Sequence, residues 1–100
     1  MPSRSQSSKS TRNPKARPAG TRGYDASSAA AFGEVVRWAR QNAGISQEAL
    51  AYMSDVERAY MGRLERGQNQ PTLFVILKIA NALGYRSSEL MALVEQRLLV

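Results

Sequence analysis

The segment from Glu57 to Gly67, ERAYMGRLERG, carries the residues best suited to chemistry with a partner. Met61 and Leu64 are its apolar positions, and a helix would turn both of them inward. The opposite side then gathers three arginines and two small residues: Arg58, Ala59, Gly62, Arg63 and Arg66. A guanidinium can donate two hydrogen bonds to O6 and N7 of guanine, and an alanine methyl can pack on the thymine methyl. Close approach of such a helix to DNA would also justify a glycine that costs about 0.5–1 kcal/mol relative to alanine.

An ordinary solvated helix face is the alternative interpretation of these arginines. The preceding residues favour DNA, because Ser46 is a good N-cap for QEALAYM and predicts a short helix over 47–53. Asp55 and Val56 separate it from a second helix over 57–66. Two short helices joined by three or four residues are typical of a helix-turn-helix unit, whose second helix enters the major groove. We therefore place such a motif at about 47–66.

Three more helices complete the predicted fold, over residues 29–43, 73–83 and 89–99. The first has apolar residues at spacings of three and four and ends at a glycine: Phe32, Val36, Ala39, Ala43 and Gly44. The second follows the N-cap Thr72 and is apolar on most sides, so it is expected at the centre of the domain. Ser87 or Ser88 is the predicted N-cap of the last helix. The fold class is therefore all-α, a compact five-helix domain over 29–100.

The net charge of +6 lies entirely in the N-terminal segment. Residues 1–24 hold six Lys or Arg and no acid, whereas residues 25–100 hold eight bases and eight acids. With many Ser, Pro and Gly and almost nothing apolar, residues 1–28 are predicted to form a disordered basic tail. Three roles remain open for it: a nucleic-acid-binding arm, a solubilising extension, or a transit peptide, whose composition it partly shares.

Enzymatic chemistry has few candidate residues in this chain. It contains no Cys and no His, which excludes disulfides, zinc fingers, a thiol nucleophile and an imidazole base. GRLERGQ has the two glycines of a phosphate-binding loop but lacks the Lys and Ser or Thr that should follow. No apolar run approaches the ~18 residues that span a bilayer. We expect no enzyme, no cofactor, no metal site and no membrane partner.

The stretch GISQEALAYMSDVERAYMGRLERGQNQPTLFVILKIANALG resembles the phage-repressor and Cro-like helix-turn-helix family, also called the xenobiotic-response-element class. The resemblance covers about residues 31–95, with SQEALA, RAYMGRLERG, PTL and KIANALG in family order and spacing. ERAYMGRLERG is especially similar to controller proteins of restriction-modification systems. The resemblance implies a lambda-repressor-like fold and a sequence-specific transcription regulator that binds double-stranded DNA, cytoplasmic and nucleoid-associated in a bacterium or phage.

The resemblance also implies roles for individual residues. The base-reading positions are Arg58, Ala59 and Arg63. The phosphate-binding positions are Gln47, Tyr60, Arg66 and Asn69. Arg40 and Glu65 match an ion pair that ties the first helix to the end of the third, and its role is expected to be structural.

Two positions depart from the family pattern. Asp55 stands in the inter-helix turn where the family usually has Gly with a positive φ, a region that Asp tolerates better than most residues. Glu57 is a poorer N-cap than the Ser, Thr or Asp that the family often has there.

The last helix has more apolar residues than one buried side requires. We predict a homodimer interface at Leu90, Leu93, Val94 and Leu98. Such a dimer would place two recognition helices about one DNA turn (~34 Å) apart on a palindromic operator. Packing of all four within one protomer is the alternative. The predicted function is a homodimeric repressor or autoregulatory controller; the alternative is an antitoxin that binds a protein toxin and represses its own operon. A toxin or polymerase is a further candidate partner.

Overall fold

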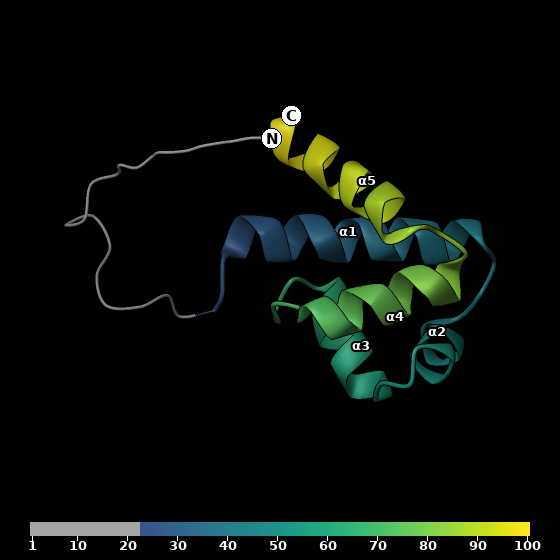
Figure 1. Cartoon of the computed structure of the whole chain (residues 1–100). Helices are drawn as coiled ribbons and strands as arrows, with labels where there is room; N and C mark the ends of the chain where they lie inside the picture. The colour runs from purple at the N-terminus through teal and green to yellow at the C-terminus, as the bar shows by residue number, and fades with distance from the viewer. Residues whose placement is uncertain (1–22) are drawn as a thin grey trace.

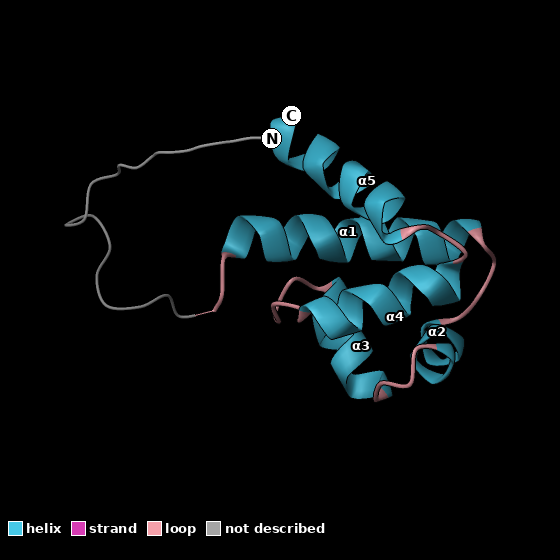
Figure 2. Ribbon diagram, in the orientation of Figure 1, coloured by secondary structure: helices cyan, strands magenta, loops and turns pink. Residues whose placement is uncertain are grey.

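The computed structural model describes residues 23–100 and folds them into five α-helices without a strand. The helices are α1 (Ala26–Asn42), α2 (Gln47–Met53), α3 (Arg58–Glu65), α4 (Leu73–Leu83) and α5 (Ser87–Leu99), joined by short loops (Figure 2). α1 runs through the middle, with α5 packed on one side and α3 and α4 on the other (Figure 1). The predicted all-α, five-helix fold is confirmed, whereas the predicted disorder falls mainly on residues 1–22, outside the described residues.

The N-terminus of α1 lies three residues before the predicted start at residue 29. Asp25 is the N-cap, and its Oδ2 accepts a hydrogen bond of 2.8 Å from the backbone N–H of Ser28. The predicted boundary between residues 28 and 29 therefore falls inside a helix, because the first turn carries no large apolar residue to mark it. At the other end Gly44 has a φ of +73° and stops the helix as predicted, but Ala43 is exposed rather than part of the apolar side.

The remaining helix ends follow local capping signals, with one exception. α2 and α4 have the predicted bounds, and the side chains of Ser46 and Thr72 accept from backbone N–H groups as N-caps. α3 is shorter than predicted by one residue at each end. The N-cap of α5 is Arg86 and neither of the predicted serines, because Glu89 accepts a 2.8 Å hydrogen bond from the Arg86 backbone N–H.

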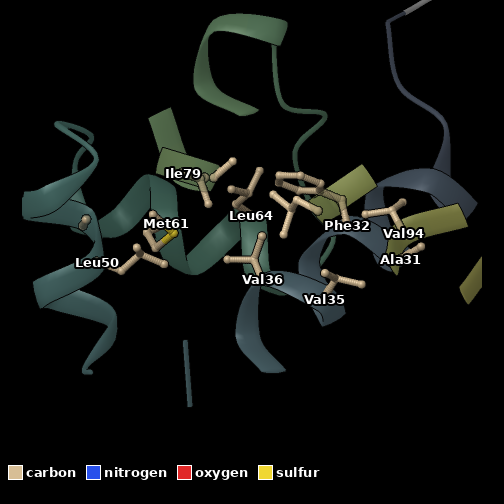
Figure 3. Packing of buried hydrophobic residues seen from close by; sticks show 12 residues of the cluster. Ala31, Phe32, Val35, Val36, Leu50, Met61, Leu64, Ile79 and Val94 are labelled. Carbon is tan, nitrogen blue, oxygen red and sulfur yellow. The ribbon is translucent and has the colours of Figure 1, made fainter. Parts of the chain in front are cut away.

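The core draws buried side chains from all five helices (Figure 3). α1 contributes a continuous stripe of Phe32, Val35 and Val36, and the larger residues that meet it are Leu50, Met61, Leu64, Ile79 and Val94. Full burial of a side chain of this size stabilises the fold by about 1.5–3 kcal/mol. Both predicted inward residues of α3 are fully buried, so the core fixes which side of that helix faces out.

Gly33 sets how closely α1 approaches α3. A Cβ at this position would lie 2.5 Å from the Leu64 carbonyl oxygen and 2.7 Å from that of Glu65. No side chain fits there without a backbone shift, so glycine permits the crossing. The sequence reasoning missed Gly33, because a glycine within a helical pattern does not reveal which partner approaches it.

α4 is not the central helix that its composition predicted. Only Ile79 and Ala80 are fully buried in it, whereas Leu73, Phe74 and Leu77 are 70%, 65% and 45% exposed. α1 occupies the centre instead, and it leaves one side of α4 uncovered (Figure 1). The exposed residues Leu73, Phe74 and Leu77 are called the α4 apolar face below.

Two of the four predicted dimer-interface residues are wrong for that role. Leu90 and Val94 are 0% and 3% exposed and belong to the core of the protomer, because α5 packs along α1. Leu93 is half-buried against the same core, and Leu98 is 47% exposed.

Within residues 23–100 no helix has the length and apolar character needed to cross a membrane. The same residues contain no group of three or more acidic, His or Cys side chains able to hold a metal ion.

Candidate nucleic-acid interface

The turn between α2 and α3 sets the orientation of α3 relative to α2. Asp55 has a φ of +57° and is the one non-glycine residue with a positive φ in the described part of the chain. The left-handed conformation expected at this position is therefore present. The Val56 backbone N–H donates to the Ala51 carbonyl at 3.0 Å, which closes the turn back onto α2.

The outer side of α3 presents the predicted base-reading residues. Arg58 and Ala59 are exposed in its first turn, and Arg63 is partly exposed one turn further on. Glu57 makes no side-chain hydrogen bond as N-cap, in line with its poor capping ability. The first turn of α3 is thus held by the buried residues on its inner side rather than by a cap.

Tyr60 lies beneath Arg63 rather than on the outermost side of α3. Its ring is partly buried against the core, and the Arg63 guanidinium carbon lies 5.9 Å from the ring centroid. Burial raises the pKa of the Tyr60 hydroxyl, and the positive charge of Arg63 opposes that rise. The hydroxyl is therefore a neutral donor at physiological pH, and the ring supports Arg63 through a cation–π contact.

Gly62 is not exposed on the outer side of α3, where the sequence analysis expected it to allow close approach to DNA. It is buried, because the side chains of Arg66 and Gln47 cover it. A Cβ there would lie 3.2 Å from Nη1 of Arg66 and 3.4 Å from Oε1 of Gln47. The glycine makes room for these two side chains, which come from the C-cap of α3 and the first position of α2.

A buried polar network ties α1, α2 and α3 together behind this face. Arg40 donates from Nε to Oε2 of Glu65 at 2.7 Å and from Nη2 to Oε1 at 3.0 Å, so the expected ion pair is present. Arg40 also donates to the Ile45 carbonyl, and Gln47 donates to Glu65 Oε1, each at 3.0 Å. Hydrogen bonding to Glu65 raises the pKa of Arg40, and its side chain is 12% exposed against 3% for Glu65.

An open cavity of about 190 Å³ lies beside the network. Its lining residues are Arg37, Arg40, Gln47, Glu65 and Arg66. Three guanidinium groups face a single carboxylate, so the cavity favours an oxyanion such as a phosphate. Two predicted phosphate-binding residues are brought together here, while Tyr60 and Asn69 lie outside the cavity lining. Sequence reasoning missed Arg37, although its spacing of three from Arg40 on a helix was a usable signal.

A model of the helix-turn-helix family matches residues 36–90, and the chain belongs to that family. It is a DNA-binding transcriptional regulator. It is 39% identical over 61 residues to the control protein C.BamHI of Bacillus amyloliquefaciens, a match covering 60% of this chain and 75% of the relative.

Solved structures of controller proteins have the same fold. The restriction-modification controller protein C.AhdI from Aeromonas hydrophila matches with a TM-score of 0.60 and 44% identity, over 62% of this chain and 94% of that one. The controller protein C.Esp1396I, solved as a tetramer with its natural 35-base-pair operator, matches with a TM-score of 0.68 and 23% identity, over 73% and 96%. None of these relatives supports the alternative role as an antitoxin.

Proposed function

We propose that the chain is a homodimeric repressor or autoregulatory controller that binds a palindromic operator through the major groove. The observation that carries this proposal is the outer side of α3, where Arg58 and Ala59 stand exposed directly after the Asp55 turn. The protein would act by occupancy, holding a site that polymerase needs, in the cytoplasm where its DNA is. The similarity to C.BamHI and C.AhdI, named as controller proteins, favours autoregulation.

Base reading is assigned to Arg58, Ala59 and Arg63. Each arginine can donate two hydrogen bonds to a guanine, and Ala59 offers a methyl contact to thymine. Tyr60 supports Arg63 from below, so this guanidinium is better ordered than one on a free side chain. We therefore expect a half-site with guanines at two positions and a thymine near the first of them.

Phosphate binding is assigned to Gln47, Tyr60, Arg66 and Asn69, and the cavity adds Arg37. Gln47 and Arg66 come from different helices but lie together over Gly62, so one phosphate could contact both. Arg40 and Glu65 are assigned a structural role, because Glu65 holds the Gln47 amide and pairs with Arg40. Phosphate contacts fix the register of α3 on the duplex without reading sequence.

The dimer interface is assigned to the α4 apolar face in place of the buried residues of α5. Three large apolar side chains exposed on one short helix exceed what scattered surface residues would give. A second copy of the chain is the occupant that a palindromic operator requires, because a two-fold axis in the protein matches the one in the DNA. Phe74→Glu should yield monomers in analytical ultracentrifugation, whereas Leu99→Glu, at an 85% exposed residue of α5, should leave dimers.

Selection of bound sites from random duplexes tests the whole proposal. The wild type should select inverted half-sites whose centres are about one helical turn apart. Arg58→Ala should lose ~1–3 kcal/mol on the selected site, about 5- to 150-fold in affinity, and relax preference at one base pair. Arg86→Ala, at an exposed arginine outside α3, is the matched control and should keep both. Equal losses on selected and random DNA for Arg58→Ala would contradict base reading.

A further inference from the structure

The loop that follows α3 is fastened to the segment that leads into α1. The Tyr24 hydroxyl donates to the Gly67 carbonyl at 2.8 Å, and the Asp25 backbone N–H donates to Oε1 of Gln70 at 2.7 Å. Gln70 in turn donates from Nε2 to the Ser28 hydroxyl at 3.1 Å. These residues, Tyr24, Asp25, Ser28, Gly67 and Gln70, are called the clasp below.

Backbone contacts hold the loop on both sides of Gly67. Gly67 is buried with a φ of +74°, and a Cβ there would lie 3.0 Å from the Cα of Ala30 in α1. The Gly67 N–H donates to the Leu64 carbonyl at 3.0 Å, and the Gln68 N–H donates to the Arg63 carbonyl at 2.9 Å. These two bonds close the last turn of α3. The end of α3 is therefore attached to the start of α1 as well as to its own last turn.

Asn69 lies between the two points at which the clasp holds the loop. Gln70 follows it directly and Gly67 precedes it by two residues, and its side chain is partly exposed. In Figure 1 this loop and the start of α1 lie at the same end of the molecule. An Asn side chain is short, so the position of its amide follows closely from the position of its backbone. Fixing Gly67 and Gln70 thus fixes where the Asn69 amide can reach.

The α1 side of the clasp lies outside the part of the chain that the family model matches. That match begins at residue 36, whereas Tyr24, Asp25 and Ser28 precede it. Membership of the helix-turn-helix family therefore does not account for this attachment, which is observed in the structure of this chain.

We propose that Tyr24 and Gln70 are positioning residues for DNA binding, which hold the loop so that the Asn69 amide meets a phosphate with little loss of freedom. The proposal rests on the proposed function, which assigns Asn69 to a phosphate. Ordering a loop upon binding costs affinity, and a loop that is already held in the free protein avoids this cost. Because phosphate contacts carry no sequence information, the clasp should set affinity and leave the preference among sequences unchanged.

The first test measures DNA affinity in the full chain carrying Tyr24→Phe and Gln70→Ala, called the clasp variant. Its affinity should fall about 3- to 10-fold on the selected operator and on a random duplex alike. The slope of log affinity against log salt concentration should stay unchanged, because no Lys or Arg contact is lost. The control Arg97→Gln breaks an exposed 2.6 Å hydrogen bond to Glu34 on the other side of α1 and should stay within about 2-fold of wild type.

A double-mutant cycle tests whether the clasp acts through Asn69. Asn69→Ala alone should lower affinity about 10-fold, and adding the clasp substitutions to it should cost less than about 2-fold more, because the group that they position is gone. A full additional loss would contradict the role of Asn69. A salt slope that falls by about 0.9 in the clasp variant would also contradict it, since the lost contact would then be one made by a Lys or Arg such as Arg66.

A second measurement follows the loop in the free protein, where no DNA contact contributes. The backbone order parameter of Asn69 from NMR relaxation should be about 0.85 in the wild type and below about 0.6 in the clasp variant. Tyr24→Phe alone keeps the Gln70 attachment and should give an intermediate value, which also serves if the clasp variant does not fold. An unchanged order parameter would refute the positioning role, whatever happens to DNA affinity.

Failure of this inference is distinguishable from failure of the proposed function. If Asn69→Ala lowers affinity and the clasp variant does not, the positioning role of Tyr24 and Gln70 is wrong and the phosphate contact stands. If Asn69→Ala itself keeps the wild-type affinity, the phosphate assignment of Asn69 is wrong, and the inference falls with it.

Discussion

Replacement of Arg40 by methionine should destabilise the domain more than its position at a solvent-facing cavity suggests. The variant keeps most of the side-chain volume but removes three hydrogen bonds, two to Glu65 and one to the Ile45 carbonyl. Glu65, whose side chain is 3% exposed in the wild type, would keep the Gln47 amide as its one partner in the network. An uncompensated buried charge of this kind costs about 3–5 kcal/mol, and the remaining hydrogen bond offsets about 1 kcal/mol.

A loss of about 2–4 kcal/mol is a large share of the ~5–15 kcal/mol by which a small domain is stable. It should lower Tm by about 10–30 °C for a domain of this size, measured by circular dichroism, with urea unfolding giving the free energy. Because the pKa of Arg40 is raised above its ordinary strongly basic value, its contribution is fully present below that value. Arg40 therefore carries its charge at both pH 6 and pH 9. Arg40→Met with Glu65→Leu should recover part of the lost stability. If the free energy of unfolding of Arg40→Met lies within about 1 kcal/mol of the wild-type value, the reasoning is refuted.

Three further predictions concern backbone and capping. Gly33→Ala should lose about 2 kcal/mol of stability in urea unfolding, because its Cβ overlaps the Leu64 carbonyl and the gain in helix propensity only partly compensates. An unchanged urea midpoint would mean that α1 can shift to make room for the methyl group. Asp55→Val should lose about 1–2 kcal/mol because a β-branched residue resists a positive φ, with Asp55→Gly as the control that keeps stability. Hydrogen bonds from Ser28 lower the pKa of Asp25 in the folded protein below its ordinary value of 3.8. The contribution of the Asp25 cap to stability is therefore fully present above pH 3.8 and is lost as the pH falls through the lowered pKa of the folded state. Asp25→Asn caps without titrating, so the Tm difference between it and wild type should change across that acid range; a constant difference would contradict the capping role.

The parts of the fold that the sequence predicted well are those set by neighbouring residues. α2 and α4 have their predicted bounds because Ser46, Thr72 and Gly84 act within a turn of their own helix. The positive φ of Asp55 was expected instead from the family resemblance, because the family usually has a glycine with positive φ in this turn. The family resemblance supplied the ion pair of Arg40 with Glu65, which no local pattern could have given.

The errors about which residues are buried share one physical cause, which is that burial depends on which helix lies between the others. The composition of α4 suggested a central helix. A helix that is apolar on most sides is equally compatible with a buried position and with a surface position whose apolar side packs on another protomer. Leu90 and Val94 were assigned to an interface because their spacing does not tell whether α5 packs on α1 or on another protomer. Only the packing of α5 along α1 decides between them.

The polar network also explains why the candidate site is partly structural. The Gln47 amide nitrogen carries two hydrogens, and one of them is committed to Oε1 of Glu65. The other hydrogen is not used by Glu65, so the network leaves one amide donor for the phosphate contact proposed above. Arg66 is held differently, by a 3.3 Å hydrogen bond from Nη2 to Oε1 of Gln68 and by its position over Gly62. Under the proposed phosphate-binding role of Gln47, stability and DNA binding share atoms at this site, so a substitution that moves Glu65 should also displace the Gln47 amide, although Glu65 itself is assigned no DNA contact.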